Sequence, residues 1–524
     1  TCLLLNFIDA GYFAFSGKRS GMEMLRLQSA QNASPLAYVL DYWHLAVLLL
    51  VCTWLTWKYY PVLKQGAVIK NAKGFFIQCL LLLVCASLAF LGARGSLGLK
   101  PLNTLDAARL TSPELMPLTL NTPFQFLLTL EQVGVDRKNY MSDEEAAATF
   151  NPEKTVDHAL LSRKKNIVLL IVESLGKEYV GYYNKNKGYT PFLDSLMQQS
   201  TVYMNAYSNG KRSIEGIPAI LSAMPGWMPG DLMNSFYKSN RLHSTGYYLA
   251  KQGYDVSFYH GGKNGTMSFD QFIANTGAGK YYGLNEYPDR QKDFDGTWGI
   301  YDEPYLQYFS DQLATKSRPF YSTLFTLSSH HPYKLPSQYA GVFKGGPLPI
   351  HATIAYTDFA LKRFFESAKK QAWYANTLFI ITADHSSENQ QQQYLTSAGK
   401  YAIPLLVFDP SMPVNKEMNN TISQLNICDE IMNRCLPNET PYFSFASKYA
   451  IQYDNGIYQL IDHPYVLKFD GDRTSAFYNL QTDTFLRKNL VGAESLKARK
   501  DSLEWYLKAV IQQYNNRLID NKTH

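Results

Sequence analysis

Beyond residue 160, four long apolar runs each lead directly to a side chain that can bind a metal or carry a proton. The runs and the residues after them are 166–172 with Glu173, 254–259 with His260, 319–328 with His330 and His331, and 377–383 with Asp384 and His385. Continuous apolar runs of this length are typical of strands buried on both faces of a parallel sheet. Such sheets bind ligands at the carboxyl ends of their strands. The pattern therefore predicts an α/β sheet with a candidate site at one edge.

The segments around these runs complete the expected fold. Helical patterns lie near 191–200, 214–223, 242–252, 303–316 and 352–370, and a further strand is expected in 401–408. Alternating strands and helices favour a doubly wound α/β fold, a mostly parallel sheet between layers of helices. After about residue 455, short runs separated by turns predict a small antiparallel C-terminal sheet.

Ser213 is a further candidate, because it stands where a Gly-containing loop, SNGKR, meets a predicted helix. A serine there can be an ordinary N-cap. It also lies near the positive end of the helix dipole, beside Lys211 and Arg212. If the hydroxyl bound a divalent cation, it would lose its proton more readily and could attack phosphorus. The residues alone leave both roles open.

Two apolar stretches near the N-terminus are predicted to cross a membrane, at about 36–57 and 74–93. Each approaches the roughly 20 residues that a bilayer requires. Asp41 and His44 weaken the first prediction, since ionisable groups are costly inside a bilayer. A buried core helix is the alternative for either stretch.

The loop between these stretches carries Lys58, Lys64, Lys70 and Lys73, which places it in the cytoplasm by the positive-inside rule. We therefore expect a multi-pass protein of the cell (inner) membrane, with everything after Arg94 outside the cytoplasm. The expected organisation is an anchor over 1–94, a connector over 95–160 and a catalytic domain over 161–524. The number of helices before Thr1 is left open.

The net charge of +6 is no nucleic-acid signature, and it suits an anionic lipid surface or a solvated face equally well.

Only two of the six cysteines, Cys428 and Cys435, fall in the predicted external domain. They are seven residues apart in a helical pattern, which separates them by roughly 10 Å. That distance is too long for a disulfide unless the helix breaks, so we expect buried thiols, with a bridge as the alternative.

Eight short segments resemble, in their order, the lipoteichoic acid synthase family. They are NIVLLIVESLG, SNGKRSIEGIPAIL, FYHGGKNG, WGIYDEPYL, LSSHHPY, AYTDFAL, TADHSSE and FYNLQTDTFLRKNL. The family comprises membrane-anchored phosphoglycerol transferases of the sulfatase/alkaline-phosphatase superfamily. The resemblance covers about 165–490 and the anchor.

The resemblance implies an alkaline-phosphatase-like fold, one divalent metal and a covalent Ser or Thr intermediate. The metal is usually manganese, with magnesium or zinc as alternatives. By matching motif positions, the resemblance implies metal ligation by Glu173, Ser213, Asp384 and His385, with Ser213 also the nucleophile. It implies that His330 holds the substrate phosphate and that His260 also binds substrate.

The resemblance also implies partners: a membrane phospholipid donor such as phosphatidylglycerol, and an extracytoplasmic glycan or glycolipid acceptor.

One departure from the family pattern concerns the donated headgroup. Where glycerol-phosphate polymerases carry a Trp and an Arg, this chain has Met267 and Phe269, so the basic group would have to come from Lys263. The acceptor, and single or polymerising transfer, stay open.

Other activities remain as alternatives on the same scaffold. Phosphoethanolamine transfer is the nearest, and a sulfatase or phosphodiesterase-type hydrolase is another. A sulfatase precursor needs Cys or Ser followed by x-Pro-x-Arg, whereas IEGIP follows Ser213. A non-catalytic binding module would be expected to lack at least one of the four predicted ligands, and all four are present.

Overall fold

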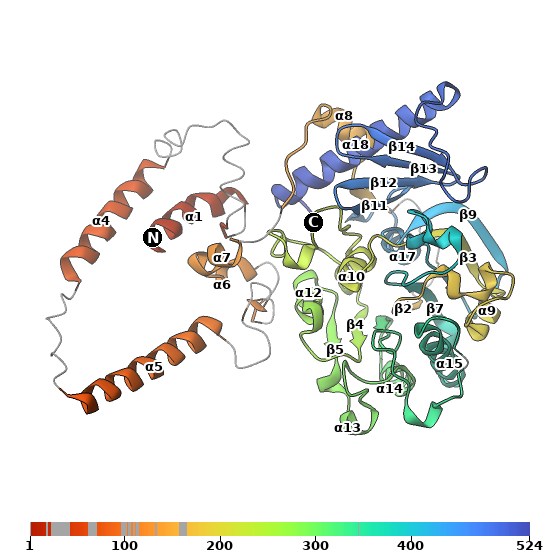
Figure 1. Ribbon diagram of the computed structural model, residues 1–524, viewed down its shortest axis with the longest axis horizontal. Coiled ribbons are helices and arrows are strands. Elements are labelled where there is room, and N and C mark those ends of the chain that lie inside the picture. Colours follow the sequence, from red (N-terminus) through yellow and green to blue (C-terminus); the bar gives the residue numbers. More distant parts are fainter. Residues whose placement is uncertain are drawn as a thin grey trace. The chain divides into compact units, whose positions relative to one another are not determined.

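The computed structural model describes residues 2–16, 19–21, 42–60, 71–95, 102, 106–107, 110–111, 115–130, 134–156, 165–343 and 345–524. The chain divides into two compact units, Thr1–Gln132 and Val133–His524, and Figure 1 shows the elements of each.

An eight-stranded sheet forms the centre of the second unit, in the order β5-β4-β6-β2-β7-β8-β3-β9. Its strands are β2 (Asn166–Val172), β3 (Thr201–Tyr207), β4 (Asp255–His260), β5 (Lys280–Tyr282), β6 (Phe320–Phe325), β7 (Thr377–Ala383), β8 (Leu405–Phe408) and β9 (Lys416–Ser423). Every residue of β2, β6 and β7 is buried, as the continuous apolar runs require. Only β8 runs antiparallel to its neighbours, so the predicted mostly parallel sheet is confirmed.

Two groups of helices pack around this sheet (Figure 1). One group contains α9 (Pro191–Met197), α14 (Asp302–Ala314) and α15 (Ile350–Ala368); the other contains α10 (Ser213–Ser222), α11 (Thr245–Lys251) and α17 (Asn426–Cys435). Further helices are α12 (Phe269–Thr276), α13 (Arg290–Asp293) and α16 (Gln392–Leu395). The helices predicted near 191–200, 214–223, 242–252, 303–316 and 352–370 correspond to α9, α10, α11, α14 and α15.

The predicted C-terminal sheet is also present. It consists of the antiparallel strands β11 (Ala450–Asp454), β12 (Ile457–Asp462), β13 (Tyr465–Phe469) and β14 (Thr474–Asn479). The long helix α18 (Lys497–Ile519) packs against β13. Cys428 and Cys435 both lie on α17 as free thiols, with Cys428 buried and Cys435 partly exposed.

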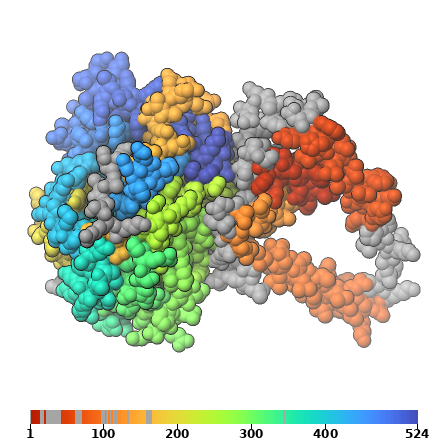
Figure 2. All heavy atoms as spheres, turned by 180° about the vertical axis from the view of Figure 1, so that it is seen from behind, coloured from red at the N-terminus to blue at the C-terminus, as the bar shows by residue number. Residues whose placement is uncertain are grey.

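Residues 134–156 belong to the second unit, although the sequence suggested a connector reaching residue 160. Strand β1 (Glu153–Thr155) pairs with β10 (Pro441–Phe443), and α8 (Asp143–Thr149) packs against α18. Figure 2 shows this orange segment lying against the dark blue C-terminal residues. The compact unit that contains the sheet therefore begins at Val133. Residues 157–164 lie outside the described part.

The first unit contains α1 (Cys2–Ser16), α4 (Trp43–Tyr59), α5 (Ala72–Arg94), α6 (Met116–Thr119) and α7 (Thr122–Leu128). Within the described residues, α5 alone is long and apolar enough to cross a membrane. It matches the span predicted at 74–93 and ends at Gly95, whose positive φ of 65° suits a glycine cap. Helix α4 covers part of the other predicted span, and residues 36–41 lie outside the described part. So do Lys64 and Lys70 of the predicted cytoplasmic loop.

Candidate active site

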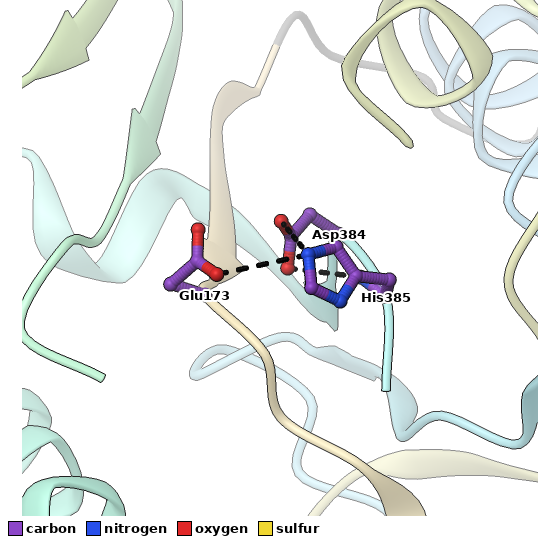
Figure 3. Close-up of side chains that lie close together, drawn as sticks. All are labelled: Glu173, Asp384 and His385. Carbon is purple, nitrogen blue, oxygen red and sulfur yellow. Dashed lines mark hydrogen bonds and ion pairs between the residues drawn. The ribbon is translucent and has the colours of Figure 1, made fainter. Parts of the chain in front are cut away.

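The centre of the sheet brings three ligand-type side chains together. Glu173 follows β2 and Asp384 follows β7, and these parallel neighbours end in register at Val172 and Ala383. His385 is the next residue along the chain. Figure 3 shows the three side chains converging. One ligand atom of each lies within 4.8 Å of the others. His385 Nε2 is 3.2 Å from Asp384 Oδ2 and 3.7 Å from Glu173 Oε1.

The hydroxyl of Ser213 joins this cluster. Ser213 is the first residue of α10 and is buried. Its Oγ donates a hydrogen bond to Glu173 Oε2 at 3.3 Å and lies 3.4 Å from His385 Nε2. Arg212 occupies the N-cap position of α10, so the hydroxyl of Ser213 does not serve as the N-cap. The polar side-chain atoms of the four residues predicted to bind the metal therefore lie close together.

Burial and like charge give this cluster unusual protonation. Burial, and then the charge of Asp384, raise the pKa of Glu173 to about 8. Burial lowers the pKa of His385, but the adjacent carboxylates Asp384 and Glu173 outweigh that effect and raise it above its ordinary value. Glu173 and His385 therefore hold protons more tightly than usual, and a cation bound here would replace those protons.

The donor set fits a divalent cation. Asp384 Oδ2 is buried and accepts no hydrogen bond from the described residues, and its near neighbour is His385 Nε2 at 3.2 Å. A buried carboxylate oxygen that accepts no hydrogen bond is costly, and a metal ion would relieve that cost. Two carboxylates, one imidazole nitrogen and one hydroxyl suit manganese, magnesium or zinc, so the residues do not select one metal.

Three further residues orient these groups, and sequence reasoning missed them. Ser174, at a φ of 58°, donates from Oγ to Glu173 Oε1 (2.6 Å) and from its backbone N–H to Asp384 Oδ1 (2.8 Å). The backbone oxygen of Ser386 accepts a bond from His385 Nδ1 at 2.7 Å, which turns Nε2 toward the cluster. Gln424 Nε2 donates to the carbonyls of Ala383 and Asp384 at 2.7 and 2.6 Å. Ser174 adjoins Glu173 in the sequence, whereas nothing in the sequence points to Gln424.

The three residues predicted to bind substrate lie on neighbouring segments. His260, at the end of β4, is buried, donates from Nδ1 to the backbone oxygen of Phe325 at 3.2 Å, and stacks on that ring. Burial lowers the pKa of His260 to about 4, so it is neutral. His330 is half-buried after β6, and Lys263 is exposed with its Nζ 5.4 Å from the centre of the Phe294 ring. Within the described residues, no hydrogen bond or ion pair connects these three with the Glu173–Asp384–His385 cluster.

The loop that carries His330 is held by a buried carboxylate. Asp302, the first residue of α14, accepts from the backbone N–H groups of Leu327 (2.7 Å) and Ser328 (3.2 Å) and from Thr357 Oγ1 (2.7 Å). This explains the Asp in the WGIYDEPYL segment as a structural anchor.

Phe269 is one of the two residues that stand where glycerol-phosphate polymerases carry a Trp and an Arg. It is buried against His260 and Phe325 and forms part of the core.

Comparison with protein families identifies the scaffold. The sulfatase family model matches residues 165–434, just over half of the chain, and this range contains all seven predicted site residues. The chain belongs to the sulfatase family.

This sulfatase-family chain has curated relatives that confirm the resemblance to lipoteichoic acid synthases. It is 25% identical over 252 residues to lipoteichoic acid synthase 1 of Bacillus subtilis (strain 168), covering 46% of this chain and 39% of the relative. It is 27% identical over 256 residues to lipoteichoic acid synthase of Staphylococcus aureus (strain bovine RF122 / ET3-1), covering 47% and 40%. The matched region spans about two fifths of the length of these relatives.

Solved structures confirm the alkaline-phosphatase-like fold of this family member. A protein of the alkaline phosphatase superfamily from Vibrio parahaemolyticus superposes with a TM-score of 0.64 at 20% identity, covering 74% of this chain and 98% of that one. The lipoteichoic acid synthase LtaP from Listeria monocytogenes superposes with a TM-score of 0.57 at 17% identity, covering 72% and 99%.

Proposed function

We propose that this chain is a metal-dependent transferase that moves a phospholipid headgroup, by way of Ser213, onto an extracytoplasmic glycan or lipid acceptor. Phosphoglycerol is the favoured headgroup, because the curated relatives are named lipoteichoic acid synthases. The observation that carries the proposal is the position of Ser213 Oγ, 3.3 Å from Glu173 and 3.4 Å from His385. A serine hydroxyl held inside a cluster of metal-ligand groups is suited to nucleophilic attack on phosphorus.

Glu173, Asp384, His385 and Ser213 Oγ would together hold one divalent metal, with manganese favoured by the resemblance. When bound, the metal supplies positive charge that stabilises a serine alkoxide and the negative charge of a reacting phosphoryl group. The positive end of the α10 dipole acts in the same direction at Ser213.

In the first step, Ser213 Oγ forms a bond to the phosphorus of the donor phosphodiester. Its hydroxyl proton has a nearby acceptor in Glu173 Oε2. The bond from phosphorus to the diacylglycerol oxygen breaks, and diacylglycerol leaves after taking up a proton. In the second step, an acceptor hydroxyl attacks the phosphorus and loses its proton, the bond to Ser213 Oγ breaks, and the serine is restored. His330 donates a hydrogen bond from a ring N–H to the phosphoryl oxygens.

Mass spectrometry of the full chain in detergent tests this proposal. With Mn²⁺ and phosphatidylglycerol, the peptide containing Ser213 should gain the mass of phosphoglycerol. Phosphatidylethanolamine in a parallel reaction tests the alternative headgroup. Ser213→Ala should show no adduct and lose transfer at least about 10³-fold, because the attacking oxygen is gone. Ser213→Thr keeps the hydroxyl and should still form the adduct. A folded Ser213→Ala protein with undiminished transfer would refute the covalent route.

We further propose that α5 crosses the membrane and that the unit Val133–His524 lies outside the cytoplasm. The apolar length of α5 and the lysines that precede it support this orientation. In a cysteine-free background, an impermeant thiol reagent applied to intact cells should label Lys497→Cys but not Lys64→Cys. The side chain of Lys497 is 60% exposed, so it is accessible to the reagent. Both positions should react after permeabilisation, and labelling of Lys64→Cys alone in intact cells would reverse the orientation.

A further inference from the structure

Trp298 lies on a loop that connects the segment after β4 with the segment after β6. Isolated strand-like bridges pair Phe294 with Ile300 and Gly262 with Gly299. The approach at Gly299 is so close that a Cβ there would lie 2.1 Å from the backbone oxygen of Gly261. This loop is therefore fixed against the segment that carries His260 and Lys263.

The backbone of Trp298 is held on both sides. Asp295 Oδ1 accepts the N–H groups of Thr297, Trp298 and Gly299 at 2.6, 2.8 and 3.2 Å. The carbonyl of Trp298 accepts the N–H of Lys263 at 3.1 Å. These bonds fix the backbone from which the half-buried indole ring projects.

The indole ring contacts the segment after β6 at one carbonyl and at one imidazole ring. Trp298 Nε1 donates to the backbone oxygen of His331 at 2.7 Å. His330 Nδ1 lies 2.8 Å from the same oxygen. The indole and imidazole rings also pack edge to face, with their centres 4.5 Å apart.

This arrangement determines which ring nitrogen of His330 is available. A carbonyl oxygen only accepts hydrogen bonds, so Nδ1 of His330 must carry a proton to bond with it. The hydrogen bonds of the described residues occupy Nδ1 of His330 and leave Nε2 without one. Nε2 is therefore the nitrogen that His330 can present to a ligand.

We propose that Trp298 is a positioning residue for His330. By holding the carbonyl of His331 and packing on the imidazole, Trp298 keeps Nδ1 of His330 bonded to that carbonyl and leaves Nε2 free to donate a hydrogen bond, in the imidazolium form, to the transferred phosphoryl group. This inference rests on the proposed role of His330 in headgroup transfer. It assigns a function to the tryptophan of the WGIYDEPYL segment.

Ring NMR tests the positioning without any need for turnover. The full chain in detergent would be labelled with ring-¹⁵N histidine, and His330→Gln would assign the His330 signals. Trp298→Phe keeps an aromatic ring but lacks the N–H donor, so the His330 Nδ1 signal should move away from that of a protonated, hydrogen-bonded nitrogen. Trp505→Phe is the matched control, because this exposed tryptophan lies on α18 and should leave the His330 signals unchanged. Unchanged His330 signals in Trp298→Phe would overturn the proposal.

Transfer kinetics supply a second readout. Loss of one hydrogen bond that orients a reacting group should lower kcat about five- to tenfold in Trp298→Phe, with KM within about twofold. Trp298→Ala also loses the ring packing and should lower kcat further, while Trp505→Phe should match the wild type. A folded Trp298→Phe protein with full kcat would overturn the proposal. Absence of a Ser213 adduct in the wild type would instead contradict headgroup transfer, and the NMR comparison would still decide the role of Trp298.

Discussion

Two carboxylates, Glu173 and Asp384, lie side by side in the least accessible part of the sheet, where only 2% and 0% of their surface is exposed. Like charges in such a place repel each other and lose their hydration. Without a cation, the cluster reduces this cost by keeping a proton on Glu173, whose pKa rises to about 8. The same residues that suit a metal therefore destabilise the metal-free protein at high pH.

Glu173→Gln should make this cost measurable. Below the ordinary pKa of about 4.5, Glu173 is protonated in both the folded and the unfolded protein. At such pH its ionisation therefore does not lower the free energy of unfolding. As the pH rises toward 8, the unfolded chain releases the proton while the folded chain retains it, and the free energy of unfolding falls. In EDTA at pH 8, Glu173→Gln should unfold at a higher urea concentration than the wild type. Its free energy of unfolding should be larger by at least about 1 kcal/mol.

The same variant should bind Mn²⁺ more weakly in calorimetric titrations, because a neutral amide replaces a carboxylate ligand. Wild-type affinity should increase from pH 6 to pH 8, as protons cease to compete with the metal. Glu417→Gln, at an exposed position on β9, is the control and should change neither property. Equal pH dependence of stability in wild type and Glu173→Gln would contradict the assignment of the buried proton.

At this scale, the sequence was most informative where a side chain follows a buried strand. The end of an apolar run marks the place where Glu173 and Asp384 emerge, so their meeting was predictable from two parallel strands. The roles of Ser174, Gln424 and Trp298 were not predictable. Each acts through a carbonyl, a backbone N–H or a neighbouring side chain whose position depends on the folded loops.

Among the elements, α10 makes the closest approach to the site. Its residue Gly216 lies so near the loop after β7 that a Cβ would be 2.3 Å from the backbone oxygen of Asp384. That oxygen is itself bonded to Gln424, so it has little freedom to move. The contact places Ser213, less than one turn earlier on α10, beside Glu173 and His385.

Gly216→Ala should therefore disturb both stability and chemistry. Alanine in a helix normally gains about 1 kcal/mol over glycine, but the clash with a fixed carbonyl should outweigh that gain. We expect a net loss of about 2 kcal/mol in the free energy of unfolding, measured by urea denaturation, and reduced formation of the Ser213 adduct. Gly226→Ala is the control, since its Cβ would meet its nearest atom at an ordinary 3.6 Å. Equal stability of the two variants would show that α10 can move away from Asp384.

Strands of the central sheet that are buried almost throughout were predictable from the sequence, whereas its strands of mixed burial were not. Strands β2, β4, β6 and β7 follow apolar runs, and four of the predicted site residues stand at or just after their ends. Strands β3 and β9 were missed because each alternates or mixes buried and exposed positions, and β9 begins with the exposed segment KEMNN. The antiparallel direction of β8 depends on chain connections that local pattern does not encode.

For the whole molecule, the most informative difference lies in residues 134–156. Side chains of α18 bind the main chain of this segment as a neighbouring strand would. Gln512 Oε1 accepts the N–H groups of Tyr140 and Met141 (2.7 and 3.2 Å), and Gln512 Nε2 donates to the backbone oxygen of Met141 at 3.0 Å. Asn516 bonds both the N–H and the carbonyl of Lys138 at 3.0 and 2.9 Å. These polar side chains weaken the apolar periodicity of α18, which is why neither α18 nor its union with the connector was predicted.

This union predicts where the catalytic unit can be cut. A fragment of residues 133–524 should fold and bind Mn²⁺, whereas a fragment of residues 161–524 should unfold at clearly lower urea. The shorter fragment loses strand β1 and helix α8, and it leaves the amides of Gln512 and Asn516 without their partners. Each intramolecular hydrogen bond lost in this way costs about 0.5–1.5 kcal/mol. In the full chain, Gln512→Leu removes the three bonds to Tyr140 and Met141 without shortening the protein, so it should shift the urea midpoint in the same direction by a smaller amount. Equal midpoints for the two fragments would mean that residues 134–156 rest on the catalytic unit without stabilising it, and that the functional boundary lies at residue 160 after all.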